Sequence, residues 1–224
     1  MFPEFRRGVI IGHNVNNTRA DSQLDELLIE AQGDVFTSHI TEVEYPRIKA
    51  WRDAYLSFGV SPKDFPPSID FLVGYIRKGR RLRSINKLVD IFNVVSLRWL
   101  MPCGGDDLDF VTGPLVLGFA RGSERYYPLG SPNLERKPAP GEIIYFDDAT
   151  KIVMCRCWNW KNCDVTKITP TTRNVVINVD AFISNISLRD FDAVTGSLAD
   201  LISRYCGGNI RKYVLEPVNP SFEF

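Results

Sequence analysis

The chain has 224 residues, which is enough for one large domain or two small ones. Its apolar fraction of 44% and charged fraction of 24% are typical of globular proteins. Basic and acidic residues number 27 each, so the overall charge does not indicate a nucleic-acid-binding protein. No apolar run approaches the roughly 18 residues of a membrane-spanning helix, and we expect no contact with a membrane.

The cysteines and histidines restrict the metal and redox chemistry. The five cysteines form no CxxC pair, so neither a zinc ribbon nor a thioredoxin-type site is predicted. His13 and His39 are too few for a histidine-rich metal site. The first residues are too few and too polar for a signal peptide. We therefore expect reduced thiols, a cytoplasmic location, and no metal or cofactor.

The first half of the chain is predicted to be mainly helical. A β-branched apolar run predicts a buried strand at residues 7–15. Apolar residues at helical spacing then predict a helix at residues 21–31, with an aspartate as its N-cap. Two more helices are predicted at residues 46–58 and 69–76, separated by a proline-rich loop.

A basic segment leads into an amphipathic helix. Residues 77–83, RKGRRLR, carry five positive charges and no acid. Such a run is either a solvated turn or a surface that follows a phosphate backbone. The candidate nucleic-acid contacts are Arg77, Lys78, Arg80, Arg81 and Arg83. Ser84 or Asn86 can cap the helix that follows, which is predicted to end at Pro102.

The second half changes to an alternating pattern. A Cys-Gly-Gly-Asp-Asp loop at residues 103–107 is followed by predicted strands at residues 111–120, 126–129, 142–146, 152–158 and 175–179. Gly122 and Ser123 are expected to form the hairpin turn between the first two. A helix at residues 188–205 ends at two glycines, and residues 214–224 form a tail. This order predicts an α+β fold, a helical N-terminal half packed on a mostly antiparallel sheet, in one domain over residues 1–213.

The common catalytic motifs are absent. The sequence contains no GxGxxG after a strand, no GxxxxGK[ST], no GxSxG and no HExxH. Nothing therefore indicates a nucleotide cofactor, a nucleophile elbow or a catalytic zinc. Cys103 is a conceivable nucleophile, but the negative end of the preceding helix dipole disfavours its thiolate.

Several segments together match a known family. Residues 84–93 contain an Asn-x-x-Val-Asp-x-x-Asn pattern, and residues 50–62 read AWRDAYLSFGVSP. An Asp-Leu-Asp sequence at residues 107–109 precedes Gly113. With these features, residues 46–182 resemble the B3/4 domain, which is the editing domain of the phenylalanyl-tRNA synthetase beta subunit and of free-standing relatives. The flanking sequence is more similar to the free-standing proteins.

The resemblance implies an aminoacyl pocket between the helix after the basic segment and the sheet that follows. It implies hydrolysis of the ester that joins a wrongly attached amino acid to its tRNA. The protein would orient a water molecule against this ester, while hydrogen bonds stabilise the oxyanion that forms. Transfer RNA is then the expected partner, and an aminoacyl group occupies the pocket. The expected substrate-binding residues are Asn86, Asn93, Gly104, Asp107, Trp158, Lys161, Asn162, Thr166 and Asn178.

The sequence departs from the synthetase pattern at this pocket. Gly104 stands where the family has a histidine, Asn178 replaces an acidic residue, and Phe92 replaces a threonine. Lys161 and Asn162 align with an Arg-Asp pair of free-standing members. Three hypotheses therefore remain: a trans-editing deacylase of mischarged tRNA, a non-catalytic module that binds tRNA or an aminoacyl group, and an enzyme acting on a small aminoacyl metabolite.

Overall fold

The structure is a computed structural model that describes residues 2–18, 21–37 and 46–224, so His39 lies outside the described residues. Its helices are α1 (Ser22–Thr37), α2 (Pro46–Ser57), α3 (Ser68–Arg77), α4 (Lys87–Trp99) and α5 (Leu188–Cys206). Its strands are β1 (Phe5–His13), β2 (Cys103–Asp107), β3 (Leu115–Phe119), β4 (Ile143–Asp147), β5 (Val153–Arg156), β6 (Lys161–Asn162), β7 (Val175–Phe182) and β8 (Asn209–Leu215).

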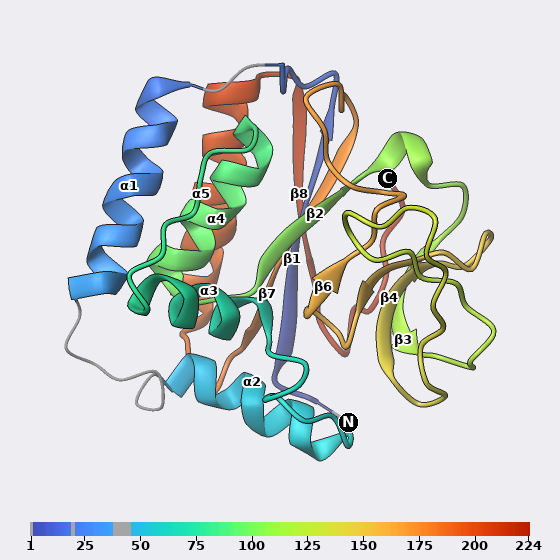
Figure 1. The fold of residues 1–224 in the computed structure, drawn as a ribbon. Helices are drawn as coiled ribbons and strands as arrows, with labels where there is room; N and C mark the ends of the chain where they lie inside the picture. The colour runs from blue at the N-terminus through green and yellow to red at the C-terminus, as the bar shows by residue number, and fades with distance from the viewer. Residues whose placement is uncertain (1, 19–20, 38–45) are drawn as a thin grey trace.

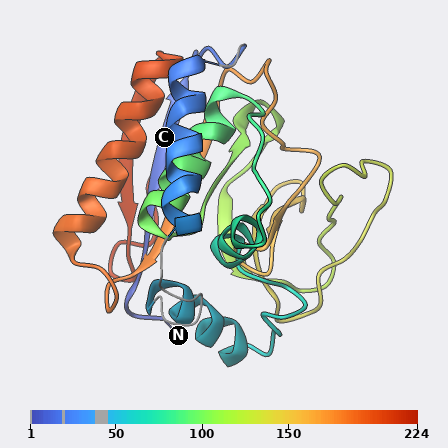
Figure 2. The same ribbon diagram turned by 60° about the vertical axis from the view of Figure 1, so that its left-hand side comes forward.

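The elements form three layers (Figure 1). A layer of helices covers one face of a central antiparallel sheet of order β2-β7-β1-β8, and a second antiparallel sheet of order β3-β4-β5-β6 lies on the other side. Figure 2 shows α1, α4 and α5 as neighbours in the helix layer. The predicted α+β fold, with helices before an antiparallel sheet, is confirmed. No helix in the described ranges is long and apolar enough to cross a membrane.

The central sheet has two different faces because side chains alternate along a strand. Ile10 and Ile177 point to the helix layer and join the main apolar core. Val9 and Val176 point the other way and pack in a second cluster with Tyr145 of β4. The register also places Arg7 opposite Asp180, and Gly104 opposite Asn178. The face toward the second sheet is therefore partly polar, in contrast to the helix face.

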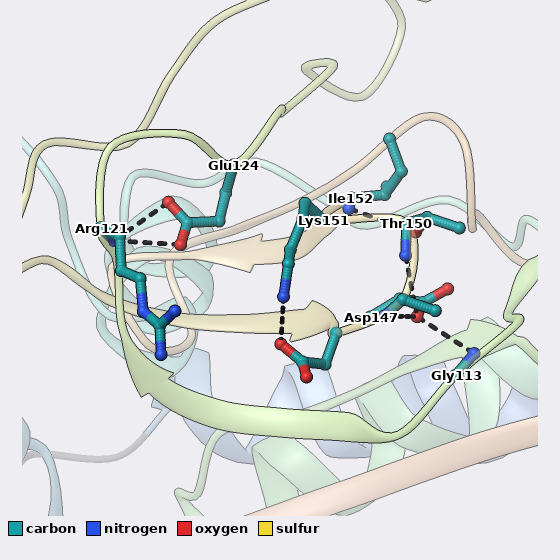
Figure 3. A network of polar contacts seen from close by, with 9 residues as sticks. Gly113, Arg121, Glu124, Asp147, Thr150, Lys151 and Ile152 are labelled. Atoms are coloured by element: carbon teal, nitrogen blue, oxygen red, sulfur yellow. Dashed lines mark hydrogen bonds and ion pairs between the residues drawn. The ribbon is translucent and has the colours of Figure 1, made fainter.

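The second sheet is tied together by a buried carboxylate at the end of β4 (Figure 3). Asp147 accepts hydrogen bonds from the backbone N–H groups of Thr112, at 2.9 Å, and Gly113, at 3.1 Å, and also from the turn after β4. Burial alone would raise the pKa of Asp147, but the N–H donors have the larger effect, so the pKa lies below its usual value. A Cβ atom at residue 113 would lie 2.5 Å from the Cβ of Ala149, so this close approach requires glycine.

Two predictions for the second half were wrong, a loop and a strand with its hairpin turn. Residues 103–107 are strand β2 and not a loop, because pairing with β7 overrides the low strand propensity of glycine and aspartate. Residues 126–129 make only isolated bridges, since Pro128 has no N–H group to donate to a ladder, and Gly122 and Ser123 turn no regular hairpin. Residues 209–215 form edge strand β8 against β1, so the expected boundary between domain and tail at residue 213 falls inside a strand.

Candidate functional site

A small cavity of about 40 Å³ lies between the two sheets, next to the N-terminus of α3. Residues of β1, β2, β4, β5 and β7 line it, together with residues of the loop after β5. Four of the predicted substrate-binding residues line this cavity: Gly104, Trp158, Asn162 and Asn178. The structure therefore brings together residues that lie up to 74 positions apart in the sequence, from Gly104 to Asn178.

Asn159 presents an unpaired donor at this cavity. The hydroxyl of Tyr55 accepts from the Asn159 backbone N–H, at 3.2 Å, and donates to Asn159 Oδ1, at 2.8 Å. Tyr55 thereby holds both the backbone and the side chain of Asn159. Asn159 Nδ2 is buried and has no hydrogen-bond partner in the described part of the chain. A buried donor without a partner is costly, so this group stands out among the residues that line the cavity.

Trp158 presents a second unpaired donor. Its ring packs edge-on against Trp51, with centroids 5.2 Å apart, and against Phe5, at 5.0 Å. The indole Nε1 is buried and finds no acceptor among the described residues. Trp158 has a φ of 69° and Cys157 a φ of 46°, a left-handed conformation that is unfavourable for bulky residues. Backbone strain of this kind concentrates at functional sites.

The strained loop is held by the carboxylate of Glu142, the residue directly before β4. Glu142 Oε1 accepts from the backbone N–H of Cys157, at 3.0 Å. Both oxygens of Glu142 also accept from the guanidinium of Arg156, at 2.8 and 2.6 Å. A bidentate pair of this kind is geometrically specific. The loop that carries Trp158 is therefore held by a rigid strand, so its two donors keep a fixed position.

Asp106 supplies a buried carboxyl group to the same cavity. Its side chain points to the second sheet, and Oδ1 accepts a hydrogen bond of 2.6 Å from the hydroxyl of Thr166. Burial raises the pKa of Asp106 to about 7, although the Thr166 bond and the positive charge of Arg7 oppose this shift. A carboxyl group with a pKa near 7 can act as an acid or a base near neutral pH.

Arg7 lies beside the cavity and is paired with Asp180. Its Nε and Nη2 donate to the two carboxylate oxygens of Asp180, both at 2.8 Å, and both side chains are almost fully buried. Burial opposes the charge on Arg7, but the adjacent Asp180 raises its pKa. Arg7 Nη1 is buried and has no acceptor within the described ranges. The polar face of the central sheet therefore carries a third unpaired donor.

The other predicted substrate-binding residues lie elsewhere. Asn86 is the N-cap of α4, and its Oδ1 accepts from Val89 N at 3.1 Å. Asp107 accepts from the hydroxyl of Thr172 at 2.5 Å, on the helix side of β2. Thr166 reaches the cavity only through Asp106. Lys161 is exposed, and Asn93 is half-buried on α4 without lining the cavity.

Helix α4 therefore lies outside the cavity and packs against one of the strands that line it. It packs against β2 on the face opposite the cavity, and it contributes no residue to the cavity lining. Its polar residues serve the helix start: Asn86 caps it, and Asp90 accepts from the Ser84 hydroxyl at 2.6 Å and from Ile85 N at 3.0 Å. The predicted pocket wall is instead β2, the segment that was expected to be a loop.

A comparison with protein families identifies the family of the chain. Residues 50–207 match the B3/4 domain family, which is most of the chain. The chain belongs to the B3/4 domain family. The resemblance predicted from the sequence is thereby confirmed. A comparison with curated proteins found no match.

A solved structure is also similar, an N-terminal fragment of the phenylalanyl-tRNA synthetase beta-subunit from Pyrococcus horikoshii. The match has a TM-score of 0.45 and 14% sequence identity, and covers 92% of this chain. It covers 46% of the other chain, so the present chain spans about half the length of that fragment.

Residue 104 of this B3/4 domain lies at an open position of the cavity. A Cβ atom built there would meet only the side-chain amide of Asn162, at 3.9 and 4.0 Å. Asn162 Nδ2 donates to Gly105 O at 3.2 Å, so this side chain is fixed beside the open space. Gly104 therefore leaves room in the cavity.

The basic segment lies in the helix layer of the B3/4 fold. Gln32 of α1 accepts from the backbone N–H of Leu82, at 2.7 Å, and so holds the segment against α1. The side chains of Lys78, Arg80, Arg81 and Arg83 are exposed. Arg77 is the last residue of α3, about 14 Å along the helix axis from Ser68 at the cavity.

Cys103 lines the cavity, whereas His13 does not. Burial raises the pKa of the Cys103 thiol well above its usual range, which disfavours a nucleophilic thiolate at neutral pH. All five cysteines are free and buried. His13 ends β1, where its Nδ1 lies 3.1 Å from Asn174 Oδ1. The described residues contain no cluster of side chains that could hold a metal ion.

Sequence reasoning missed Arg7, Asp106 and Asn159. Asp106 was overlooked because residues 103–107 were expected to form a loop, whereas strand alternation places Asp106 at the cavity and Asp107 on the other face. The sequence did contain one indication of a buried carboxylate, because the adjacent residues Asp106 and Asp107 lie in a segment flanked by apolar residues. Asn159 has no local signal, because its orientation depends on Tyr55, which is 104 positions away.

Proposed function

We propose that this B3/4 protein is a trans-editing deacylase, which hydrolyses the ester between a wrongly attached amino acid and its tRNA. One observation carries the proposal. Trp158, Asn159 and Asp106 all line the cavity between the sheets, and Trp158 Nε1 and Asn159 Nδ2 are buried N–H donors without a partner among the described residues. Ester hydrolysis requires donors for an oxyanion and a base for water, and these groups supply both.

The proposed reaction begins with water attack on the ester carbonyl. Asp106, as a carboxylate, accepts a proton from the attacking water while the oxygen adds to the carbonyl carbon. The carbonyl oxygen becomes an oxyanion, which accepts hydrogen bonds from Trp158 Nε1 and Asn159 Nδ2. The tetrahedral intermediate then releases the ribose oxygen, which takes the proton from Asp106. The products are a free amino acid and the uncharged tRNA.

The amides of Asn162 and Asn178 are proposed to orient the aminoacyl group. Both residues line the cavity. Asn162 Nδ2 is bonded to Gly105 O, so its Oδ1 is the atom that can accept from the substrate amino group. Gly104 leaves space beside this amide. We therefore expect the size of the residue at position 104 to influence which amino acid is accepted.

The exposed basic side chains are proposed to contact tRNA phosphates. Arg80 and Arg81 are exposed at the far end of α3 from the cavity. A separation of about 14 Å along α3 is short compared with a tRNA acceptor arm. Charge reversal at these positions should weaken tRNA binding and its salt dependence, without changing the chemical step.

One observation favours the third hypothesis, an enzyme acting on a small aminoacyl metabolite. The basic segment packs against α1 through Gln32 and Leu82, in the helix layer, whereas the cavity lies on the opposite face of the central sheet. A small substrate would reach the cavity without any contact with this segment. Hydrolysis of a free aminoacyl ester that is insensitive to salt and to charge reversal at Arg80 would select this function.

The experiment measures release of the amino acid from a panel of mischarged tRNAs. The wild-type chain should deacylate at least one of them faster than the spontaneous rate. Asn159→Ala should lower this rate about 10²–10³-fold, as expected for loss of one oxyanion donor. Asn133→Ala, in an exposed loop, is the matched control. No release above the spontaneous rate across the whole panel would overturn the proposal.

A further inference from the structure

A second and larger cavity lies between the two sheets. It measures about 490 Å³, within the range of about 300–1,000 Å³ that is usual for small-molecule sites. Most of its lining is apolar and includes Val9, Val176, Leu115 and Leu117. It adjoins the cavity of about 40 Å³ described above, because Arg7 and Tyr145 line both cavities.

Residues 216–224 cover this cavity and are fixed at two points. Glu216 forms an ion pair with Arg6, with Oε2 3.1 Å from Nε. Phe222 stacks on Tyr213 of β8, with ring centroids 4.0 Å apart and planes 12° apart. Figure 1 shows the C-terminus beside the space between the two sheets. The C-terminal segment is thus a wall of the cavity.

Arg7, which lines this cavity, carries a buried donor that has no partner among the described residues. Arg7 uses Nε and Nη2 on Asp180, so Nη1 is left to bind an acceptor. The guanidinium lies over the ring of Tyr145, 4.8 Å from its centroid. This arrangement offers hydrogen bonding at one end of an otherwise apolar space.

The charges around the cavity argue against an anionic ligand. Asp180 already balances the charge of Arg7, and Glu216 is paired with Arg6. An added carboxylate would therefore be a buried charge without an opposite charge, which is unfavourable. A neutral oxygen can accept from Arg7 Nη1 without this penalty.

We propose that this cavity binds a neutral, largely apolar small molecule whose carbonyl or hydroxyl oxygen accepts a hydrogen bond from Arg7. This inference goes beyond the proposed deacylation, since it requires neither an ester nor tRNA. Its test is a binding measurement without RNA, so its outcome is independent of whether the protein deacylates.

The test uses the full chain and a matched set of probes. Nile red is a neutral aromatic ketone whose fluorescence rises in apolar surroundings, and it should bind with one site per chain. Competition by 2-decanone should be at least tenfold stronger than competition by decanoate, which has the same chain length and a negative charge. Equal or stronger competition by decanoate would overturn the charge argument, and no binding of either neutral probe would overturn the site.

A substitution in the cavity lining tests where Nile red binds. Leu115→Trp places a large ring in the cavity and should lower the affinity for Nile red at least tenfold, whereas Leu129→Trp, at an exposed position outside the lining, should not. In the wild-type chain, 2-decanone should also slow amide hydrogen exchange in residues 209–224. Unchanged exchange in this segment, or unchanged affinity in a folded Leu115→Trp variant, would overturn the location.

Discussion

The raised pKa of Asp106 has a direct consequence for stability. Below about pH 4 the Asp106 carboxyl group is protonated in both the folded and the unfolded chain. Between the usual pKa of 3.8 and the raised pKa of about 7, the folded protein keeps a proton that the unfolded chain has lost. Since the folded state binds more protons there, the free energy of unfolding falls as pH rises through this window.

The magnitude follows from the two pKa values. Their difference corresponds to about 4 kcal/mol, at 1.36 kcal/mol for each pH unit. Asp106→Asn cannot ionise, and its side-chain oxygen can still accept from Thr166. Relative to this variant, the wild type should therefore lose up to about 4 kcal/mol of stability between pH 4 and pH 8.

Urea unfolding of both proteins at several pH values between 4 and 8 measures this effect, because all other titrating groups are shared and cancel. Asp64→Asn, at an exposed position, should show no such difference from the wild type. Thr166→Val removes a hydrogen bond that lowers the pKa of Asp106, so the loss of stability should begin at the same pH and extend to higher pH. A constant difference between wild type and Asp106→Asn from pH 4 to pH 8 would refute the reasoning.

Three further predictions concern stability, each measured by urea unfolding. Gly104→Ala should change the free energy of unfolding by less than about 1 kcal/mol. Gly113→Ala should lower it by about 2 kcal/mol or more, because the new Cβ would meet the Cβ of Ala149 at 2.5 Å. Equal effects of the two substitutions would contradict this prediction. Arg7→Met should cost about 3–5 kcal/mol by leaving Asp180 unpaired, and Asp180→Leu in the same chain should recover much of it; additive losses would count against the ion-pair argument. Asn86→Ala should cost about 1–2 kcal/mol as a lost N-cap, and no loss would argue against the cap.

The helices were predictable because their signals are local. Asp21 accepts from Gln23 N and Leu24 N at the start of α1, as its N-cap position predicted. Asn86 likewise caps α4. These residues act within three positions of themselves, so a sequence window contains the whole interaction. The same holds for the glycine that follows α5.

The strands that decide the site were less predictable because their partners are distant. Strand β2 has poor strand formers and exists through its register with β7, about 70 positions later. Strand β8 is an edge strand with charged residues, and pairs with β1 at the other end of the chain. The error at β2 carried over to the site, because a loop gave no reason to choose Asp106 over Asp107.

The prediction for Trp158 was only partly complete. The resemblance placed it near the substrate, and it does line the cavity. Its left-handed backbone and the unpaired Nε1 depend on Glu142 and on rings from α2 and β1, which no local pattern reveals. The residue was therefore predictable, whereas its unpaired donor required the structure.

Asp106 is proposed to act as the base of an ester-hydrolysing cavity. The most direct measurement is the single-turnover rate of deacylation of a mischarged tRNA between pH 5 and pH 9, for wild type and Asp106→Asn. The wild-type rate should rise with pH and level off above about pH 7, as the carboxyl group loses its proton. Asp106→Asn should lose this rise and be slower by about 10²–10⁴-fold above pH 7. Equal rates and equal pH profiles for the two proteins would contradict the account.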